Sequence, residues 1–256
     1  ILIAVEDTEI TYTALALLDN DTDADGNPLT IGSVSNPTGG TVVLNTDGTV
    51  TFTPTPNFNG PATFSYTAND GTSNSVPAIV TVNVFAVNDA PVAVADSVTV
   101  VEDTAINYSV ASLLANDTDV DSAHNTLTIA SVTSGANGTA VLDAINQQVI
   151  FTPNANFNGI ADFTYQISDG SLTSNSATVS VTVTAVNDAP VAVPDTLTAT
   201  NEDTARTYSF AELLVNDTDV DSPHSALTVA SVVAGTGGTV SIDPVAKTVT
   251  FTPTPN

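Results

Sequence analysis

Acidic side chains are the residues of this sequence whose types and spacing point most directly to chemistry. The string Asn-Asp-Thr-Asp-x-Asp occurs three times, at residues 20–25, 116–121 and 216–221, and Glu-Asp-Thr occurs at residues 6–8, 102–104 and 202–204. The chain holds 28 Asp and Glu against two Lys and Arg, so almost no side-chain cation can pair with these carboxylates. Hard divalent cations bind such oxygens, and Ca²⁺ tolerates irregular geometry better than Mg²⁺. The acidic strings therefore predict bound Ca²⁺.

The net charge of −26 excludes several other classes of function. Nucleic-acid binding needs cations that displace phosphate counterions, and docking on an anionic membrane needs them too. No apolar stretch is long enough for a membrane span, so we expect no direct membrane insertion. The 42% of hydrophobic residues is enough for packed cores, which sets the chain apart from a disordered acidic tail. The absence of Cys excludes disulfides, thiolate metal sites and a Cys nucleophile.

The acidic strings belong to a tandem repeat with a period of about 100 residues. Val-Asn-Asp-Ala-Pro occurs at residues 87–91 and 186–190, Phe-Thr-Pro occurs three times, and Asn-Phe-Asn-Gly occurs at residues 57–60 and 156–159. A period of this length fits one domain for each unit. We expect a first repeat at residues 1–86 without its N-terminal strand, a complete middle repeat at 87–185, and a third repeat at 186–256 truncated at its C-terminus. We interpret the sequence as a window onto a longer array.

The elements that position the acids are predicted to be short strands. Within a unit, apolar and polar residues alternate with a period of two, most clearly at residues 160–167 and 178–184, and Gly, Asn, Asp and Pro bound the apolar runs. Only residues 110–115 suggest a helical turn. Seven short strands in each unit predict an all-β fold of tandem antiparallel sandwiches of immunoglobulin-like type, arranged end to end.

The set of motifs resembles a known family. VNDAP, EDT, LLxNDTDxD, FTPxxxFNG and FxYxxxDG are similar to those of the cadherin-like, immunoglobulin-like tandem repeats of giant bacterial surface proteins and RTX-type adhesins. The resemblance implies a calcium-binding extender domain, repeated many times between a cell anchor and a ligand-binding tip, and a secreted or cell-surface location. One departure is Ser122 and Ser222, where the first repeat has Gly26.

Strand ends of such a sandwich alternate between two poles, which predicts where the acids meet. In the middle repeat the turn with Glu102 lies at the far pole, while the loop with Asp119, the turn with Asp169 and the linker with Asp89 lie at the near pole. Stacking repeats would bring these poles together, and unpaired carboxylates there would need a cation. The candidate ligands are Glu6, Asp7, Asn88, Asp89, Asp117, Asp119, Asp121 and Asp169 at the first junction; Glu102, Asp103, Asn187, Asp188, Asp217, Asp219 and Asp221 at the second; and Asp21, Asp23, Asp25 and Asp70 in the first repeat.

One other interpretation of these residues stays open. Asn-Asp-Thr-Asp also suits a solvated turn, since Asx side chains bond their own backbone. An EF-hand fits poorly, because the position of its bidentate Glu falls on Gly32. His124 and His224 are interpreted as solvent-facing loop residues, and no recurring nucleophile, base or cofactor loop is found, so we expect no enzyme activity.

The leading functional hypothesis is mechanical. Calcium at each junction would stiffen a string of domains that spaces a ligand-binding tip from a bacterial cell, with neighbouring repeats of the same chain as its first partners. The alternatives are the shaft or subunit of an extracellular fibre, in which the incomplete third repeat accepts strands from a neighbour, and a module that binds a glycan or protein. Other domains of the parent protein would supply an extracellular protein or glycan partner.

Overall fold

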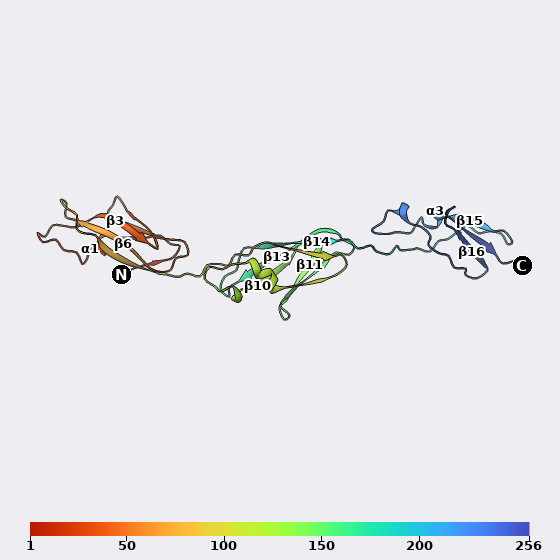
Figure 1. The fold of residues 1–256 in the computed structure, drawn as a ribbon, viewed down its shortest axis with the longest axis horizontal. Helices are drawn as coiled ribbons and strands as arrows, with labels where there is room; N and C mark the ends of the chain where they lie inside the picture. Colours follow the sequence, from red (N-terminus) through yellow and green to blue (C-terminus); the bar gives the residue numbers. More distant parts are fainter. Residues whose placement is uncertain (256) are drawn as a thin grey trace. The chain divides into compact units, whose positions relative to one another are not determined.

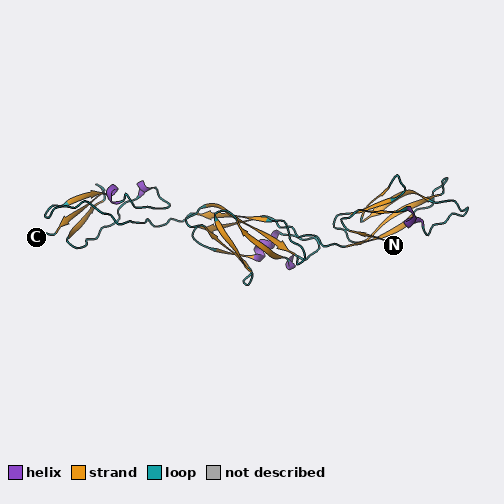
Figure 2. Cartoon of the chain, turned by 180° about the vertical axis from the view of Figure 1, so that it is seen from behind, coloured by secondary structure: helices purple, strands orange, loops and turns teal. Residues whose placement is uncertain are grey.

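The computed structural model describes residues 1–255, and strands dominate it (Figures 1 and 2). The chain divides into two compact units, and the residues of the middle repeat are shared between them. The first unit holds Ile1–Ala95, Ser109–Val132 and Tyr165–Ala177, and the second unit holds the remaining residues. None of the helices among residues 1–255 is long and apolar enough to cross a lipid bilayer.

The first repeat is a sandwich of two sheets. One sheet has the order β1-β7-β6-β3 and the other the order β2-β5-β4, with a short helix between β2 and β3. Thr13 caps that helix through its side chain, which accepts a hydrogen bond from the Ala16 amide. The elements are β1 (Leu2–Val5), β2 (Ile10–Tyr12), α1 (Ala14–Leu18), β3 (Thr30–Thr38), β4 (Gly40–Leu44), β5 (Val50–Pro54), β6 (Gly60–Asn69) and β7 (Ala78–Phe85).

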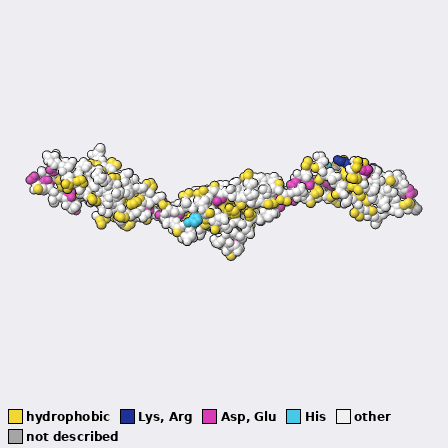
Figure 3. Space-filling model, viewed as in Figure 1, with side chains coloured by type: hydrophobic (Ala, Val, Ile, Leu, Met, Phe, Trp, Pro, Cys, Tyr) yellow, Lys and Arg dark blue, Asp and Glu magenta, His cyan; other side chains and the backbone are white. Residues whose placement is uncertain are grey.

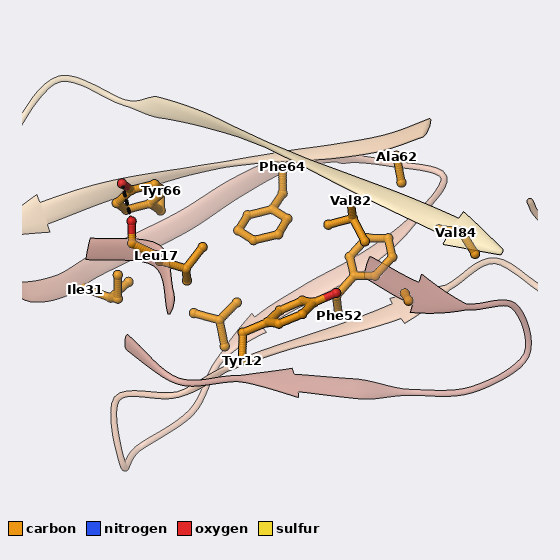
Figure 4. Packing of buried hydrophobic residues seen from close by; sticks show 11 residues of the cluster. Tyr12, Leu17, Ile31, Phe52, Ala62, Phe64, Tyr66, Val82 and Val84 are labelled. Carbon is orange, nitrogen blue, oxygen red and sulfur yellow. Dashed lines mark hydrogen bonds between the residues drawn. The ribbon is translucent and has the colours of Figure 1, made fainter. Parts of the chain in front are cut away.

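The core of the first repeat follows from the period-two alternation of its strands. Val50 and Phe52 on β5 and Phe64 on β6 are fully buried, and the rings of Phe52 and Phe64 stack with centroids 6.3 Å apart. Figure 4 shows the Phe52 and Phe64 rings between the sheets, with Val82 of β7 beside them. This packed apolar core fixes the positions of the strands, and with them the loops that carry the acidic residues.

The first and last strands of a repeat pair in parallel, which differs from the expectation of a purely antiparallel sandwich. Leu2 is opposite Val82 on β1 and β7, and Val98 is opposite Val181 in the middle repeat. Seven strands that alternate in direction leave the first and seventh pointing the same way, so these two can only pair in parallel. Residues 2–5 thus form the strand that corresponds to residues 98–101 of the middle repeat.

The middle repeat has the seven strands that the alternation predicts, together with the predicted helical turn. Its sheets have the orders β10-β13-β14-β8 and β11-β12-β9, as in the first repeat. The elements are β8 (Asp96–Val101), β9 (Ile106–Ser109), α2 (Val110–Leu113), η1 (Leu114–Asn116), η2 (His124–Thr126), β10 (Thr128–Ser134), β11 (Gly138–Asp143), β12 (Gln148–Pro153), β13 (Gly159–Ser168) and β14 (Ala177–Thr184).

The third repeat keeps one sheet in the described residues, with the order β15-β17-β16. Residues 196–201 and 228–234, which correspond to β8 and to β10, form no strand. In the middle repeat these two strands pair with β14 and β13, and the positions that correspond to those partners lie beyond residues 186–255. The elements are β15 (Arg206–Ser209), α3 (Phe210–Leu213), η3 (His224–Ala226), β16 (Gly238–Asp243) and β17 (Thr248–Pro253).

Candidate metal sites: two acidic clusters

Five carboxylates form a first acidic cluster, which we define as Glu6, Asp7, Asp89, Asp119 and Asp121. One oxygen from each of Glu6, Asp89 and Asp121 lies within 4.8 Å of the other two. Glu6 follows β1 directly, Asp89 lies in the segment after β7, and Asp121 lies in the loop before η2. All five residues belong to the first compact unit.

Backbone amides hold these carboxylates in place. The side chain of Glu6 is 1% exposed, and its Oε1 accepts a hydrogen bond from the Val87 amide at 2.6 Å. The amide of Asp89 donates to Oδ2 of Asp121 at 2.7 Å, and Oδ1 of Asp119 accepts from the amides of Asp121 and Ser122. Three segments that are far apart in the sequence are thereby joined through acidic side chains.

Four carboxylate oxygens in the two clusters are buried without a hydrogen-bond partner among the described residues: Oδ2 of Asp89 and of Asp119, Oε2 of Glu102 and Oδ2 of Asp188. A buried polar atom without a partner destabilises a fold by about 1–3 kcal/mol, and more when the group is charged. Native proteins keep few such atoms, and an ion that completes the site is one of the recognised reasons for them. The donor set therefore fits a hard divalent cation.

The electrostatics of Asp89 agree with this interpretation. Desolvation raises the pKa of its carboxyl group, and the charges of Asp7, Asp121, Glu6 and Asp119 raise the pKa further. No Lys or Arg lies at positions 1–121 to offset the repulsion. A cation bound there would replace repulsion between carboxylates with attraction to a shared charge.

A second acidic cluster repeats the arrangement in the second unit, and we define it as Glu102, Asp103, Asp188, Asp219 and Asp221. Glu102 is 2% exposed and its Oε1 accepts from the Val186 amide at 2.6 Å. The amide of Asp188 donates to Oδ2 of Asp221 at 2.5 Å, and desolvation followed by the charges of the other four acids raises the pKa of Asp188. The same residue types with the same contacts thus recur about 100 residues along the chain.

The asparagines and Asp169 of the candidate set lie beside the clusters and bond through amides. The side-chain amide of Asn88 donates to Oδ2 of Asp169 at 2.7 Å and to the carbonyl of Asp89 at 3.0 Å. The Asn88 amide is the main reason that the pKa of Asp169 is lowered. Asn187 donates to the carbonyl of Asp188 at 2.7 Å. These residues shape the linkers that carry Asp89 and Asp188.

Asp117 and Asp217 are placed apart from the clusters. The carboxylate of Asp117 is buried, accepts from the Val94 amide at 2.8 Å and lies within hydrogen-bond distance of the Tyr165 hydroxyl. Asp217 accepts from the Val193 amide at the same distance. Through these bonds, both carboxylates fix the segment that leads into their own repeat.

The acids of the first repeat bond to nearby protein groups. Oδ2 of Asp21 accepts from the Tyr66 hydroxyl at 2.6 Å, and Oδ1 of Asp23 accepts from the amides of Asp25 and Asn27. Oδ1 of Asp70 accepts from the amides of Thr72 and Ser73, and these bonds lower its pKa. Asp25 is exposed. These four acids are not part of the three-carboxylate group found among the described residues.

Asn-Phe-Asn-Gly has a positioning role that the sequence reasoning did not assign. The amides of Asn57 and Asn156 donate to Oδ1 of Asp7 and of Asp103, at 2.9 and 2.8 Å. The side chain of Asn59 donates to Oε2 of Glu6 at 3.3 Å. The signal was available, because Glu-Asp-Thr and Asn-Phe-Asn-Gly occur together in both repeats that contain the second motif.

The chain belongs to the cadherin-like domain family, whose model matches residues 2–85, 87–184 and 186–256. Cadherin-like domains are extracellular, non-enzymatic adhesion domains that generally bind Ca²⁺. In this chain three such domains occur in tandem. No curated protein matches the sequence. Figure 3 shows acidic side chains scattered along the face drawn, with basic atoms visible in the third repeat.

Solved structures similar to the chain include cadherins. Human CDH23 EC21-23 is 20% identical over 96% of this chain and 90% of its own, with a TM-score of 0.48. The protocadherin GammaB4 extracellular domain is 13% identical over 99% of this chain and 42% of its own, with a TM-score of 0.46. An endo-fucoidan hydrolase from glycoside hydrolase family 107 is 18% identical with a TM-score of 0.31, and this chain spans 38% of its length.

Proposed function

We propose that the chain is a calcium-rigidified extender segment of a bacterial adhesin, secreted or held at the cell surface, that spaces a ligand-binding tip from the cell in processes such as biofilm formation. The observation that carries the proposal is the set of buried carboxylate oxygens without partners in both acidic clusters. The bacterial and RTX-adhesin part of the proposal rests on the resemblance of the motifs to such repeats.

Glu6, Asp7, Asp89, Asp119 and Asp121 would hold a cation in the first unit, and the five equivalent acids would do so in the second. The chain supplies the preorganisation: Val87 and Asn57 amides fix Glu6 and Asp7, and the Asp89 amide fixes Asp121. Bound Ca²⁺ would supply the charge that makes this assembly of acids stable. Because the acids come from three segments, binding would couple these segments and stiffen the linker that lies among them.

Small-angle X-ray scattering tests the proposal, with the full chain in millimolar calcium and then in a chelator. We expect a constant maximum dimension with calcium, and a broader distribution of distances in the chelator because the linkers are released. A variant with Glu6→Gln and Glu102→Gln should need about tenfold more calcium than the native chain to reach the same scattering. A matched control with Glu9→Gln and Glu212→Gln changes the charge equally outside the clusters. Scattering that is unchanged by the chelator would reject calcium rigidification.

The fibre alternative is favoured by one observation in the third repeat. Residues 196–201 and 228–234 form no strand there, while their equivalents in the middle repeat pair with β14 and β13. We propose that, in a fibre, strands from another copy pair with these two segments, as in donor-strand complementation. Sedimentation of the full chain over a range of concentrations tests it: reversible association supports the fibre subunit, and a monomer at all concentrations contradicts it.

A further inference from the structure

Asparagine followed by glycine occurs three times in the chain, at residues 59–60, 137–138 and 158–159. This dipeptide has a chemistry of its own. The backbone nitrogen of the glycine attacks the side-chain Cγ of the asparagine, the proton of that nitrogen goes to the departing ammonia, and a cyclic succinimide remains. Water then opens the ring, so asparagine and water give aspartate or isoaspartate and ammonium. Glycine favours the reaction because it has no side chain to obstruct ring closure.

The dipeptide Asn137-Gly138 is closed to this reaction by packing. Gly138 is buried at the start of β11. An added Cβ on this glycine would collide with the Phe151 ring and would lie 2.9 Å from the Thr152 carbonyl. The side-chain amide of Asn137 is itself engaged, since it donates to the Ile160 carbonyl at 3.1 Å. The glycine nitrogen therefore has no room to swing toward the asparagine side chain.

The other two dipeptides are open, and both stand at the end of the Asn-Phe-Asn-Gly motif. Asn59 and Asn158 are exposed. The glycines that follow them have φ angles of 113° and 127°, a conformation that glycine adopts without steric cost. No atom lies within 4 Å of an added Cβ on Gly60, and the nearest atom to that of Gly159 belongs to the Phe157 ring, at 3.4 Å. The backbone has space there to rearrange into the ring.

Asn59 is placed so that the reaction would change the first acidic cluster. Its Nδ2 donates to Oε2 of Glu6 at 3.3 Å. Glu6 is 1% exposed, so water screens its carboxylate poorly. Asn158 holds the same motif position in the middle repeat, but Oε2 of Glu102 has no hydrogen-bond partner among the described residues. Deamidation of Asn59 would thus put a negative charge where Glu6 now accepts a hydrogen bond.

We propose that Asn59 and Asn158 deamidate spontaneously, and that the reaction at Asn59 adds a further carboxylate to the first acidic cluster. Without a cation, the new carboxylate repels Glu6 and destabilises the cluster. With a cation, it raises the negative charge that attracts the ion, and the charge of the ligands is one of the properties that set calcium affinity. The chain would in this way alter its own cluster with age and without an enzyme. The effect on calcium rests on the proposed function, and the deamidation itself does not.

Peptide mapping by mass spectrometry tests the reaction, with the full chain incubated over time in a chelator and a mildly alkaline buffer. We expect the peptides with Asn59 and Asn158 to gain the mass difference between Asp and Asn and to separate into Asp and isoAsp forms. The peptide with Asn137 should stay unchanged. In denaturant all three should convert at similar rates, because only the fold protects Asn137. The proposal is overturned if Asn59 keeps its mass in the folded chain or if Asn137 converts there as fast.

Two variants test the effect on the cluster: Asn59→Asp reproduces one product, and Asn59→Gln is the matched control that keeps an amide. In a chelator, Asn59→Asp should melt several degrees below Asn59→Gln. In a competition titration against a calcium-binding dye, it should bind calcium about tenfold more tightly. Equal melting temperatures or equal calcium affinities would contradict the placement of Asn59 in the cluster. If the native chain and both variants bound no calcium, the proposed function would fail, and the peptide map and the melts in chelator would still decide this proposal.

Discussion

At the scale of single residues, Asp119 and Glu102 divide their two carboxylate oxygens between two tasks. One oxygen of Glu102 accepts the Val186 amide and the other is buried without a partner. Asp188 uses its own amide to fix Asp221, and its Oδ2 is likewise buried and unpaired. The backbone contact sets the direction of each carboxylate before a cation arrives. Folding has then already ordered part of the ligand set, so less conformational entropy is lost when the cation binds, and binding is tighter.

The substitution Glu6→Gln changes the charge of the first acidic cluster and keeps its geometry. The substituted side chain still offers an oxygen to the Val87 amide, so the fold should survive, but one negative charge is lost. We expect calcium to bind the first acidic cluster about tenfold more weakly, or about 1.4 kcal/mol, as a competition titration against a calcium-binding dye would measure. In a chelator the variant should be as stable as the native chain or more so, because repulsion is reduced. Glu9→Gln is the control, and equal affinities of the two variants would contradict the assignment.

Sequence reasoning found the cluster acids but could not divide them from their neighbours. Repetition of Glu-Asp-Thr and Asn-Asp-Thr-Asp-x-Asp, combined with strand alternation, was sufficient to bring Glu6, Asp89 and Asp121 together. It could not show that Asp117 turns inward to Val94, because a side-chain bond to a backbone amide 23 residues away leaves no pattern in the sequence. The contact of Asp7 with Asn57 was hidden for the same reason.

At the scale of elements, a recurring Gly-Phe contact fixes how the hairpin of the smaller sheet packs. Gly40, Gly138 and Gly238 each pair with the proline of a Phe-Thr-Pro motif on the neighbouring strand. The phenyl ring of the same motif lies against the glycine, where a side chain would otherwise be. Period-two alternation predicted the strands themselves, since it depends only on which face is buried. It did not predict the parallel pair of β1 and β7, because strand order is decided by tertiary contacts.

Gly238→Ala is predicted to destabilise the third repeat. An added Cβ would lie 2.5 Å from both the Phe251 ring and the Thr252 carbonyl, so the strand would have to shift. The expected loss is about 1–3 kcal/mol of unfolding free energy, as for other overpacked sites. Urea unfolding followed by circular dichroism measures it. Gly235→Ala is the matched control, because no atom lies within 4 Å of its added Cβ. Equal stability of both variants would show that the strand adapts without cost.

Two buried tyrosines predict how the first repeat responds to alkali. Burial raises the pKa of Tyr12 to about 12, and burial together with the hydrogen bond to Asp21 raises that of Tyr66 to about 12. In the unfolded chain both titrate near 10, so the unfolded state loses its protons first. Stability is therefore complete below pH 10 and declines as pH rises from 10 to 12. Denaturant titrations across this window measure the decline, and the variant Tyr12→Phe should lessen it. A stability that stays level up to pH 12 would contradict the assigned burial.

At the scale of the whole molecule, the charge of −26 opposes every compact arrangement of the chain. The two acidic clusters lie in different compact units, and each gathers carboxylates around a linker. Within each cluster desolvation and then the neighbouring carboxylates raise the pKa of one Asp, so repulsion acts where separate segments meet. Salt and calcium relieve repulsion by different routes: salt screens it everywhere, and a bound cation cancels it at the cluster.

This difference predicts that the effect of salt on the melting temperature depends on whether calcium is present. In a chelator, raising NaCl from about 0.1 M to about 1 M shortens the Debye length from about 10 Å to about 3 Å, so the melting temperature should rise. In millimolar calcium the melting temperature should already be higher, and the same salt should raise it less or lower it, because screening also weakens calcium binding. Thermal melts at both salt concentrations measure the four values, with magnesium as the control cation. If salt raised the melting temperature equally with and without calcium, the clusters would be solvated turns rather than metal sites.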